Sequence, residues 1–200
     1  MSDIVENFKY LSQSLEFEDD RIKYDRGDGV IVNVMMTWEN PIMSASAEYV
    51  CQNGGDIIEF GFGMGIASNY IQSQSINSHT ICEIHPQVIE KAEAWAEGKS
   101  NVTLITGSWV TNKDELGTYD GIFYDADYTS DLLHFSGSVT SLSKSGTLLT
   151  FFNPASSSYN YLQIPVDGYD EVSVDASSVD PPPDYWNTSQ KIYYMPKREF

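Results

Sequence analysis

The chain contains few residues of the kinds that build disulfides, metal centres or nucleic-acid surfaces. Its 200 residues include 2 cysteines and 3 histidines. Neither Cys51 nor Cys82 belongs to a C-x-x-C motif and the histidines lack ligand spacing, so we expect buried free thiols and no metal site. Lys and Arg number 11 against 29 Asp and Glu, a net charge of -18. Because phosphate binding relies on clustered basic residues, this balance argues against a nucleic-acid partner.

Long apolar runs are also missing. No stretch approaches the roughly 18 apolar residues of a membrane-spanning helix. Asp3 and Glu6 stand near the start, where a secretory signal would be basic and then apolar. We therefore expect a cytoplasmic protein without a membrane partner, built as one domain around a single core. The surplus of acids indicates either solubility and salt adaptation or electrostatic steering of small cations. Monomer and homodimer both remain open.

The segment 56–83 has the pattern strand, glycine-rich turn, helix, strand. Apolar residues precede three glycines at alternate positions, Gly61, Gly63 and Gly65, and the second strand ends in Glu83 and Ile84. Glycines let the backbone approach a ligand, a helix start offers free N–H groups, and an acid at this distance binds ribose hydroxyls in such folds. We therefore expect a nucleoside cofactor. The alternative is a purely structural glycine turn.

The spacing of the glycines distinguishes two classes of cofactor. A dinucleotide fingerprint, G-x-G-x-x-G, requires a third glycine where this chain has Ile66. The spacing found here resembles the E-x-G-x-G turn of S-adenosylmethionine-dependent methyltransferases, in which the backbone meets an amino-acid tail instead of a pyrophosphate. S-adenosylmethionine is therefore the expected cofactor.

Short apolar strands alternate with helical patterns along the middle of the chain. This alternation predicts an α/β fold with a mostly parallel sheet covered by helices on both faces. The expected strands are 56–60, 80–84, 102–105, 121–124 and 146–152, and the expected helices are 42–51, 67–74, 86–97 and 130–142. Residues 172–174 and 191–195 predict a closing hairpin across a turn at 180–184.

The first part of the chain has a different pattern. Apolar residues at helical spacing predict a helix over 3–15, and the acidic, glycine-containing stretch 16–29 predicts a loop or a mobile lid. Residues 30–36 predict a strand. We expect residues 1–33 to form an N-terminal helix and lid-like segment, and residues 34–200 to form the methyltransferase domain.

Polar residues follow the predicted fourth and fifth strands, where open parallel sheets bind their ligands. Asp125 and Asp127 come after the fourth strand and Asn153 after the fifth. We expect Asp125 to face the methyl group of the cofactor and Asp127 to cap the next helix. Capping is the alternative role for Asp125 as well.

Two further motifs give the chain its resemblance to the guanidinoacetate N-methyltransferase family. They are Trp-Glu-x-Pro-x-Met at 38–43 and Gly-Phe-Gly-Met-x-Ile-Ala at 61–67. The likeness runs from Met35 to about Pro196 and is shared in large part by the fungal-type arginine N-methyltransferases. It implies a Rossmann-like fold with a seven-stranded sheet, mostly parallel, whose C-terminal hairpin is antiparallel.

The resemblance also implies which residues bind each ligand. Glu83 would hold the ribose hydroxyls, while Glu39 and Asp125 would grip the guanidino group of the acceptor. Ala155 and Ser156 stand in the turn that binds the acceptor's own carboxylate in the family, and of that turn Ser156 alone is retained. The residues implied to surround the cofactor are Met35, Met43, Gly61, Phe62, Gly63, Met64, Gly65, Ile66, Ala67, Glu83, Ile84, His85, Ser108, Trp109 and Asp125.

A pair of carboxylates suits the chemistry of a guanidino acceptor. The guanidinium is planar and protonated, so carboxylates hold it by paired hydrogen bonds. The attacking nitrogen needs a lone pair, and one carboxylate must therefore take a proton during the transfer. We expect Asp125 to accept this proton and Glu39 to orient the acceptor.

The predicted function is S-adenosylmethionine-dependent N-methylation of a small, cationic guanidino or amino compound, in the first place one similar to guanidinoacetate. One alternative is an arginine N-methyltransferase that acts on a protein partner. Such enzymes usually carry an added recognition domain, for which 200 residues leave little room. Another alternative is a non-catalytic S-adenosylmethionine-binding module, which would have no need of two acids facing one pocket.

Overall fold

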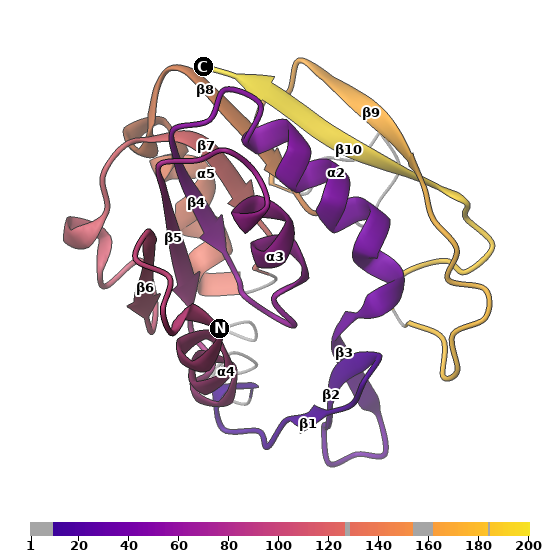
Figure 1. The fold of residues 1–200 in the computed structure, drawn as a ribbon. Helices are drawn as coiled ribbons and strands as arrows, with labels where there is room; N and C mark the ends of the chain where they lie inside the picture. The colour runs from indigo at the N-terminus through magenta and orange to yellow at the C-terminus, as the bar shows by residue number, and fades with distance from the viewer. Residues whose placement is uncertain (1–9, 127–128, 154–161, 184) are drawn as a thin grey trace.

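The computed structural model describes residues 10–126, 129–153, 162–183 and 185–200, and its centre is a seven-stranded sheet (Figure 1). The strand order is β6-β5-β4-β7-β8-β10-β9. The parallel strands are β4 (Asp56–Phe60), β5 (Ser78–Glu83), β6 (Val102–Thr106), β7 (Tyr119–Tyr124) and β8 (Ser143–Phe151). Antiparallel to β8 runs β10 (Ile192–Glu199), which also pairs with β9 (Gly168–Ser173). The predicted fold class, including the antiparallel C-terminal hairpin, is confirmed.

Helices cover both faces of this sheet. The helices α2 (Asn40–Val50), α3 (Ile66–Gln72) and α4 (Pro86–Ala96) lie on one face, and α5 (Thr129–Leu142) covers the other (Figure 1). Ile57 and Ile58 point to opposite faces of β4 and are both fully buried, Ile57 among residues of α2 and Ile58 near Phe135 of α5. A strand that is covered on both faces has a nearly continuous run of apolar residues, and this run made β4 predictable from the sequence.

A small antiparallel sheet precedes the main one, so the prediction of a loop over 16–29 was wrong. Its strands are β1 (Glu16–Phe17), β2 (Arg21–Asp25) and β3 (Ile31–Met36). Between β2 and β3 the chain reverses at Gly27 and Gly29, each with φ of +86°, and the Arg26 N–H donates to the Val30 carbonyl at 2.9 Å. Ile22 is buried against the main domain, and this burial outweighs the polar composition of the segment.

Several predicted boundaries differ from those observed. Most of the predicted helix 3–15 lies outside the described residues, and the chain has left the helical conformation after Leu11. The helix α2 begins before Pro41, at Asn40, and not at the predicted residue 42. Pro41 lies in its first turn, where the missing N–H would have no partner within the helix. The predicted hairpin turn at 180–184 belongs to a longer connection between β9 and β10. The division of the chain at residue 34 stays a prediction.

The described residues contain no helix whose length and apolarity would let it cross a membrane, and no cluster of three potential metal ligands. Cys51 and Cys82 are buried and free, as predicted. The carboxyl ends of β4 and β5 point toward the small sheet formed by β1, β2 and β3 (Figure 1).

Candidate functional site

The glycine turn after β4 is packed so closely that side chains would not fit. Gly61 has φ of +93°, and a Cβ there would lie 2.3 Å from the carbonyl oxygen of Asp125. Gly63 has φ of +54°, and its Cβ would lie 2.4 Å from the sulfur of Met35. Gly65, also at positive φ, precedes the first residue of α3. The turn therefore presents bare backbone beside a helix start, between β7 and the end of β3.

The carboxylate of Glu83 is buried at the end of β5 and fixed by backbone N–H groups. One oxygen accepts from Phe62 at 2.8 Å, and the other accepts from Ile84 at 2.8 Å and His85 at 2.9 Å. Burial raises the pKa of Glu83, and these hydrogen bonds oppose that shift. A carboxylate oxygen can accept more than one hydrogen bond, so Glu83 can also take a ribose hydroxyl.

Two methionines and a histidine complete the surroundings of the turn. The Met64 N–H donates to the sulfur of Met35 at 3.2 Å. His85 caps α4 by accepting from the Gln87 N–H at 3.3 Å, and its ring packs on Tyr10 with centroids 4.7 Å apart. Burial lowers the pKa of His85. The imidazole is therefore part of the packing of this corner.

Three other predicted cofactor residues lie on helices. Ile66 and Ala67 begin α3 directly after the turn, whereas Met43 of α2 is fully buried in the hydrophobic core. The turn, Glu83 and Met35 offer a buried anion, a helix start and a backbone surface that a Cβ would fill. These features fit the nucleoside and amino-acid parts of S-adenosylmethionine.

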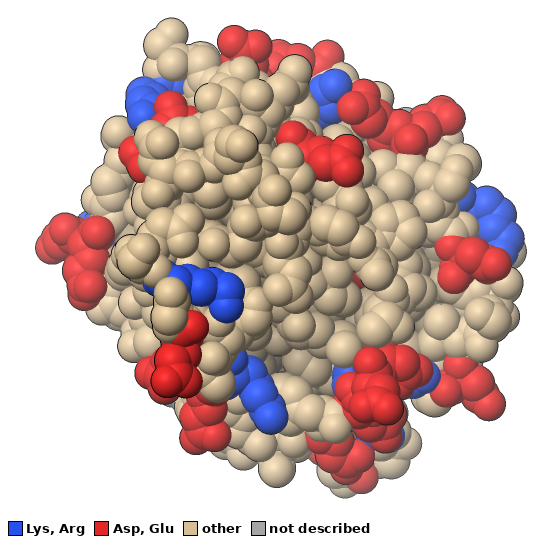
Figure 2. Space-filling model, in the orientation of Figure 1, with Lys and Arg blue, Asp and Glu red and all other residues tan. Residues whose placement is uncertain are grey.

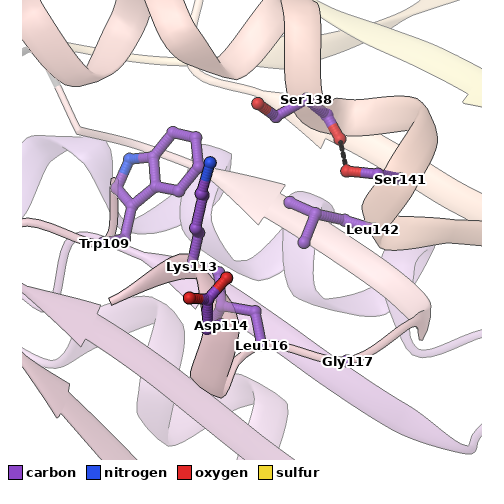
Figure 3. A pocket seen from close by; sticks show the side chains of 8 residues that line it. All are labelled: Trp109, Lys113, Asp114, Leu116, Gly117, Ser138, Ser141 and Leu142. Carbon is purple, nitrogen blue, oxygen red and sulfur yellow. Dashed lines mark hydrogen bonds between the residues drawn. The ribbon is translucent and has the colours of Figure 1, made fainter. Parts of the chain in front are cut away.

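Ser108 and Trp109 follow β6, and the structure separates their surroundings. The Gly107 N–H donates to the Glu83 carbonyl at 2.8 Å, which holds Ser108 near the end of β5. Trp109 is buried on the α5 side of the sheet, edge-on to Phe60 at 5.3 Å. It also lines a hollow of about 240 Å³ between the loop after β6 and α5 (Figure 3). The other residues that line this hollow are Lys113, Asp114, Leu116, Gly117, Ser138, Ser141 and Leu142. Of the predicted cofactor residues, Trp109 alone borders it.

Glu39 lies in a short 3-10 helix (Thr37–Glu39) between β3 and α2, and only 4% of its surface is exposed. Its Oε1 accepts two hydrogen bonds, from the Met36 N–H at 2.8 Å and from the Tyr185 hydroxyl at 2.7 Å. Burial raises the pKa of Glu39 to about 7, although both hydrogen bonds favour the ionised form. Within the described part of the chain, Oε2 accepts no hydrogen bond and is the oxygen left for a ligand.

Asp125 follows β7 and is half-buried, with its N–H donated to the Phe60 carbonyl at 2.9 Å. Burial raises the pKa of Tyr185, and the negative charges of Glu39 and then Asp125 raise it further. The pKa of Tyr193 is likewise raised by burial and by the same two charges. Both predicted acceptor-binding acids therefore lie around one pair of tyrosines.

Trp38, Phe152, Tyr185, Trp186 and Tyr193 form an aromatic cluster, and its member Tyr185 is hydrogen-bonded to Glu39. Trp186 packs on Trp38 at 5.3 Å and on Tyr193 at 6.0 Å, and Phe152 stacks on Tyr193 at 5.7 Å. Tyr185 and Trp186 were not predicted as site residues. They follow a Pro-rich segment, and nothing in that segment indicates a contact between Tyr185 and an acid 146 residues away.

Three predicted positions cannot be placed. Asp127, Ala155 and Ser156 lie outside the described residues. Their roles, and those of the other site residues, stay predictions.

Acidic residues outnumber basic ones by 29 to 11. Figure 2 shows acidic side chains, with some Lys and Arg among them, around the rim of one face, and few charged residues in its middle. Together with the net charge of -18, this distribution attracts cations and repels anions at long range, an effect that salt screens.

Comparison with known sequences gives a family match. The family model of guanidinoacetate N-methyltransferase matches residues 13–163. Two curated relatives, from Kluyveromyces lactis and Saccharomyces cerevisiae, are both described as protein arginine N-methyltransferase 2. They are 34% identical over 158 residues and 36% identical over 160 residues. Each alignment covers 72% of this chain but only 38% and 37% of the relative, so the chain spans well under half the length of these proteins.

Solved structures show the same fold at low identity. Spermidine synthase from Thermotoga maritima matches with a TM-score of 0.60 and 10% identity, covering 93% of this chain and 72% of that one. Fibrillarin from Aeropyrum pernix, solved with bound S-adenosyl-L-methionine, matches with a TM-score of 0.54 and 11% identity, covering 92% and 97%. At these identities the likeness concerns the fold.

The buried carboxylate of Glu39 predicts a specific dependence of stability on pH. Because its pKa is about 7 in the folded chain and near 4.5 when solvated, the folded chain keeps a proton that the unfolded chain loses between these values. Stability therefore falls as pH rises through this window. We expect the free energy of unfolding of Glu39→Gln, relative to that of wild type, to rise by up to about 3 kcal/mol between pH 4.5 and pH 7.5. Urea unfolding at the two pH values measures this difference.

Glu48 provides the matched control, since it is an exposed glutamate on α2. The difference in unfolding free energy between Glu48→Gln and wild type should be the same at both pH values. A Glu39→Gln difference that did not change with pH would contradict the buried, partly protonated state of Glu39.

Proposed function

The chain belongs to the guanidinoacetate N-methyltransferase family, and we propose that it transfers a methyl group from S-adenosylmethionine to a guanidino nitrogen of a cationic acceptor. The observation that supports this most directly is the position of two acids. Glu39 accepts a hydrogen bond from Tyr185, and Asp125, whose charge also acts on Tyr185, lies against Gly61 of the glycine turn. Two carboxylates in one site suit an acceptor that carries a cationic group, because buried charges need a partner of opposite sign.

In this proposal the glycine turn and Glu83 hold the cofactor. Glu83 accepts the ribose hydroxyls, and the backbone of 61–65 with the start of α3 receives the amino-acid portion. When bound, S-adenosylmethionine supplies a methyl group activated by its positive sulfur. Met35 lies against Gly63 and the backbone of Asp125 lies against Gly61, so the turn that receives the cofactor adjoins one of the acceptor acids.

Glu39 orients the acceptor. Its Oε1 is occupied by Met36 and Tyr185, so Oε2 faces the guanidinium. A bound cation stabilises the ionised carboxylate and lowers its pKa again. The aromatic cluster excludes water from this contact, which strengthens the attraction between carboxylate and guanidinium.

Asp125 receives the proton. A guanidinium nitrogen has no free lone pair, so an N–H bond must break as the new N–C bond forms. The proton passes to the carboxylate of Asp125, the nitrogen keeps the electron pair and gains the methyl group, and the sulfur becomes neutral. Because a solvated carboxylate is a weak base toward guanidinium, we expect proton transfer to accompany methyl transfer in a water-excluded site.

For the acceptor itself we propose a small guanidino compound similar to guanidinoacetate. A second candidate is an arginine side chain of a protein partner, which is favoured by the description of the relatives as protein arginine N-methyltransferase 2. The acidic surface suits either cation. The two candidates differ in whether a free small molecule is enough for turnover.

The proposed role of Asp125 predicts that Asp125→Asn separates binding from turnover. We expect the rate of methyl transfer to fall by at least about 100-fold, because the proton acceptor is gone. The rise in melting temperature caused by S-adenosylmethionine should persist, and NAD should cause none in either protein. Asp114→Asn, at an exposed acid, is the control and should keep full activity. If the cofactor no longer stabilised Asp125→Asn, Asp125 would be a cofactor-binding or structural residue instead.

The acceptor class is tested by supplying methyl-labelled S-adenosylmethionine with guanidinoacetate, arginine, agmatine, a simple amine and an arginine-containing polypeptide. We expect label in small guanidino compounds and none in the amine. Label confined to the polypeptide would establish the second candidate. Absence of label from every acceptor, with the cofactor bound, would refute catalysis and favour a non-catalytic binding module.

A further inference from the structure

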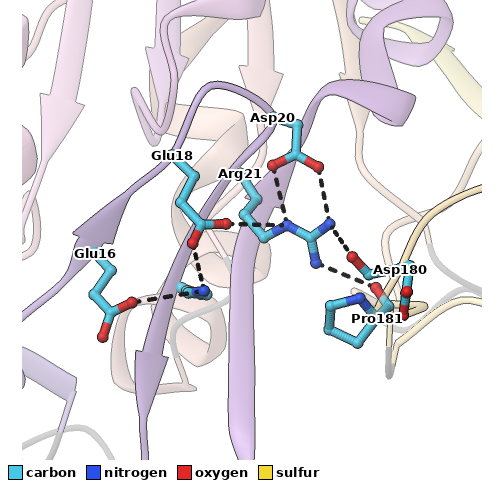
Figure 4. Close-up of polar contacts among 7 residues, drawn as sticks. Glu16, Glu18, Asp20, Arg21, Asp180 and Pro181 are labelled. Atoms are coloured by element: carbon cyan, nitrogen blue, oxygen red, sulfur yellow. Dashed lines mark hydrogen bonds and ion pairs between the residues drawn. The ribbon is translucent and has the colours of Figure 1, made fainter.

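Arg21 is the one Lys or Arg that is buried among the described residues, with 3% of its surface exposed. Its guanidinium pairs with the carboxylate of Asp20 through Nε at 3.2 Å and Nη2 at 2.8 Å, and Glu18 lies 3.7 Å away (Figure 4). The same group donates to the backbone carbonyls of Asp180 at 2.8 Å and Pro181 at 3.2 Å. One side chain thus joins β2 to the connection between β9 and β10.

The hydrogen bonds to Glu39 come from β3, which pairs with β2, and from the connection between β9 and β10. On one side, Arg21 is paired with Met36 in the β2–β3 register, and the Met36 N–H donates to Glu39. On the other side, the chain runs four residues from Pro181 to Tyr185, whose hydroxyl donates to the same oxygen. Arg21 therefore closes a ring of contacts that begins and ends at Oε1 of Glu39.

The chemistry of this contact requires arginine. A buried guanidinium is costly unless its donors are paired, so the contact forms only when both segments are in place. Its planar fork directs donors at a carboxylate and at two successive carbonyls at once. A lysine ammonium is a point charge and cannot reach all of these acceptors in fixed directions.

We propose that Arg21 is a positioning residue for the acceptor, because it holds the segment of Tyr185 against Glu39 and so fixes the direction of Oε2. This role rests on the proposed function. It differs from a merely structural role, in which loss of Arg21 would lower the melting temperature without changing how the folded enzyme treats its acceptor.

The test is a double-mutant cycle that combines Arg21→Gln with Tyr185→Phe. With the guanidino acceptor that wild type methylates best, we expect each single variant to lower kcat/KM roughly tenfold, mainly through the acceptor KM. The Kd for S-adenosylmethionine should stay within about twofold of wild type, because the glycine turn is untouched. Since Arg21 acts through Tyr185, the double variant should be no worse than Tyr185→Phe alone.

Arg26→Gln is the matched control, because Arg26 is an exposed arginine in the turn between β2 and β3, and its guanidinium pairs with Asp28 at 2.6 Å. It should behave as wild type. If Arg21→Gln does not fold, Arg21→Lys is used in the same cycle, with the same direction expected.

An unchanged acceptor KM in the folded Arg21 variant, or additive effects with Tyr185→Phe, would overturn the positioning role while leaving the proposed function intact. A parallel loss of cofactor binding would overturn it as well. A wild-type protein that methylates no guanidino acceptor would overturn the proposed function itself, and with it the role of Arg21.

Discussion

The buried carboxylate of Glu39 is the interaction on which the acceptor side of this structure depends. Its Oε1 is held by an N–H from the end of β3 and by a hydroxyl from the connection between β9 and β10. Burial opposes its charge, whereas the two hydrogen bonds support it. The balance leaves a group near neutrality that a bound guanidinium would ionise. Because Glu39 is buried, water would screen such a contact little.

The sheet explains how groups distant in sequence meet here. The parallel strands place the glycine turn, Glu83 and Asp125 together at their carboxyl ends. The antiparallel β10 brings Tyr193 beside β8. The small sheet then supplies Met35 to the proposed cofactor site and Met36 to the proposed acceptor site. The two proposed sites thus share β3 and the end of β7.

Local patterns in the sequence predicted most of the fold. The apolar β4 and the spacing of Gly61 and Gly63 predicted the strand and the turn after it, because both features follow from covalent geometry and burial within a few residues. The strands β1 and β2 were missed because they are short and rich in charged residues, and Ile22 is their one buried apolar residue. Tyr185 was missed for a different reason. Its partner is 146 residues away, and a single hydrogen bond leaves no periodic trace.

The central claim, that Glu39 is the counter-ion of a guanidinium, is tested most directly by counting protons. Calorimetric titration of the acceptor into protein saturated with demethylated cofactor, in buffers of different ionisation enthalpy at pH 6, measures proton release on binding. Because Glu39 has a pKa of about 7 in the free protein, we expect release of close to one proton, which Glu39→Gln should abolish. Binding without proton release in wild type would contradict the account.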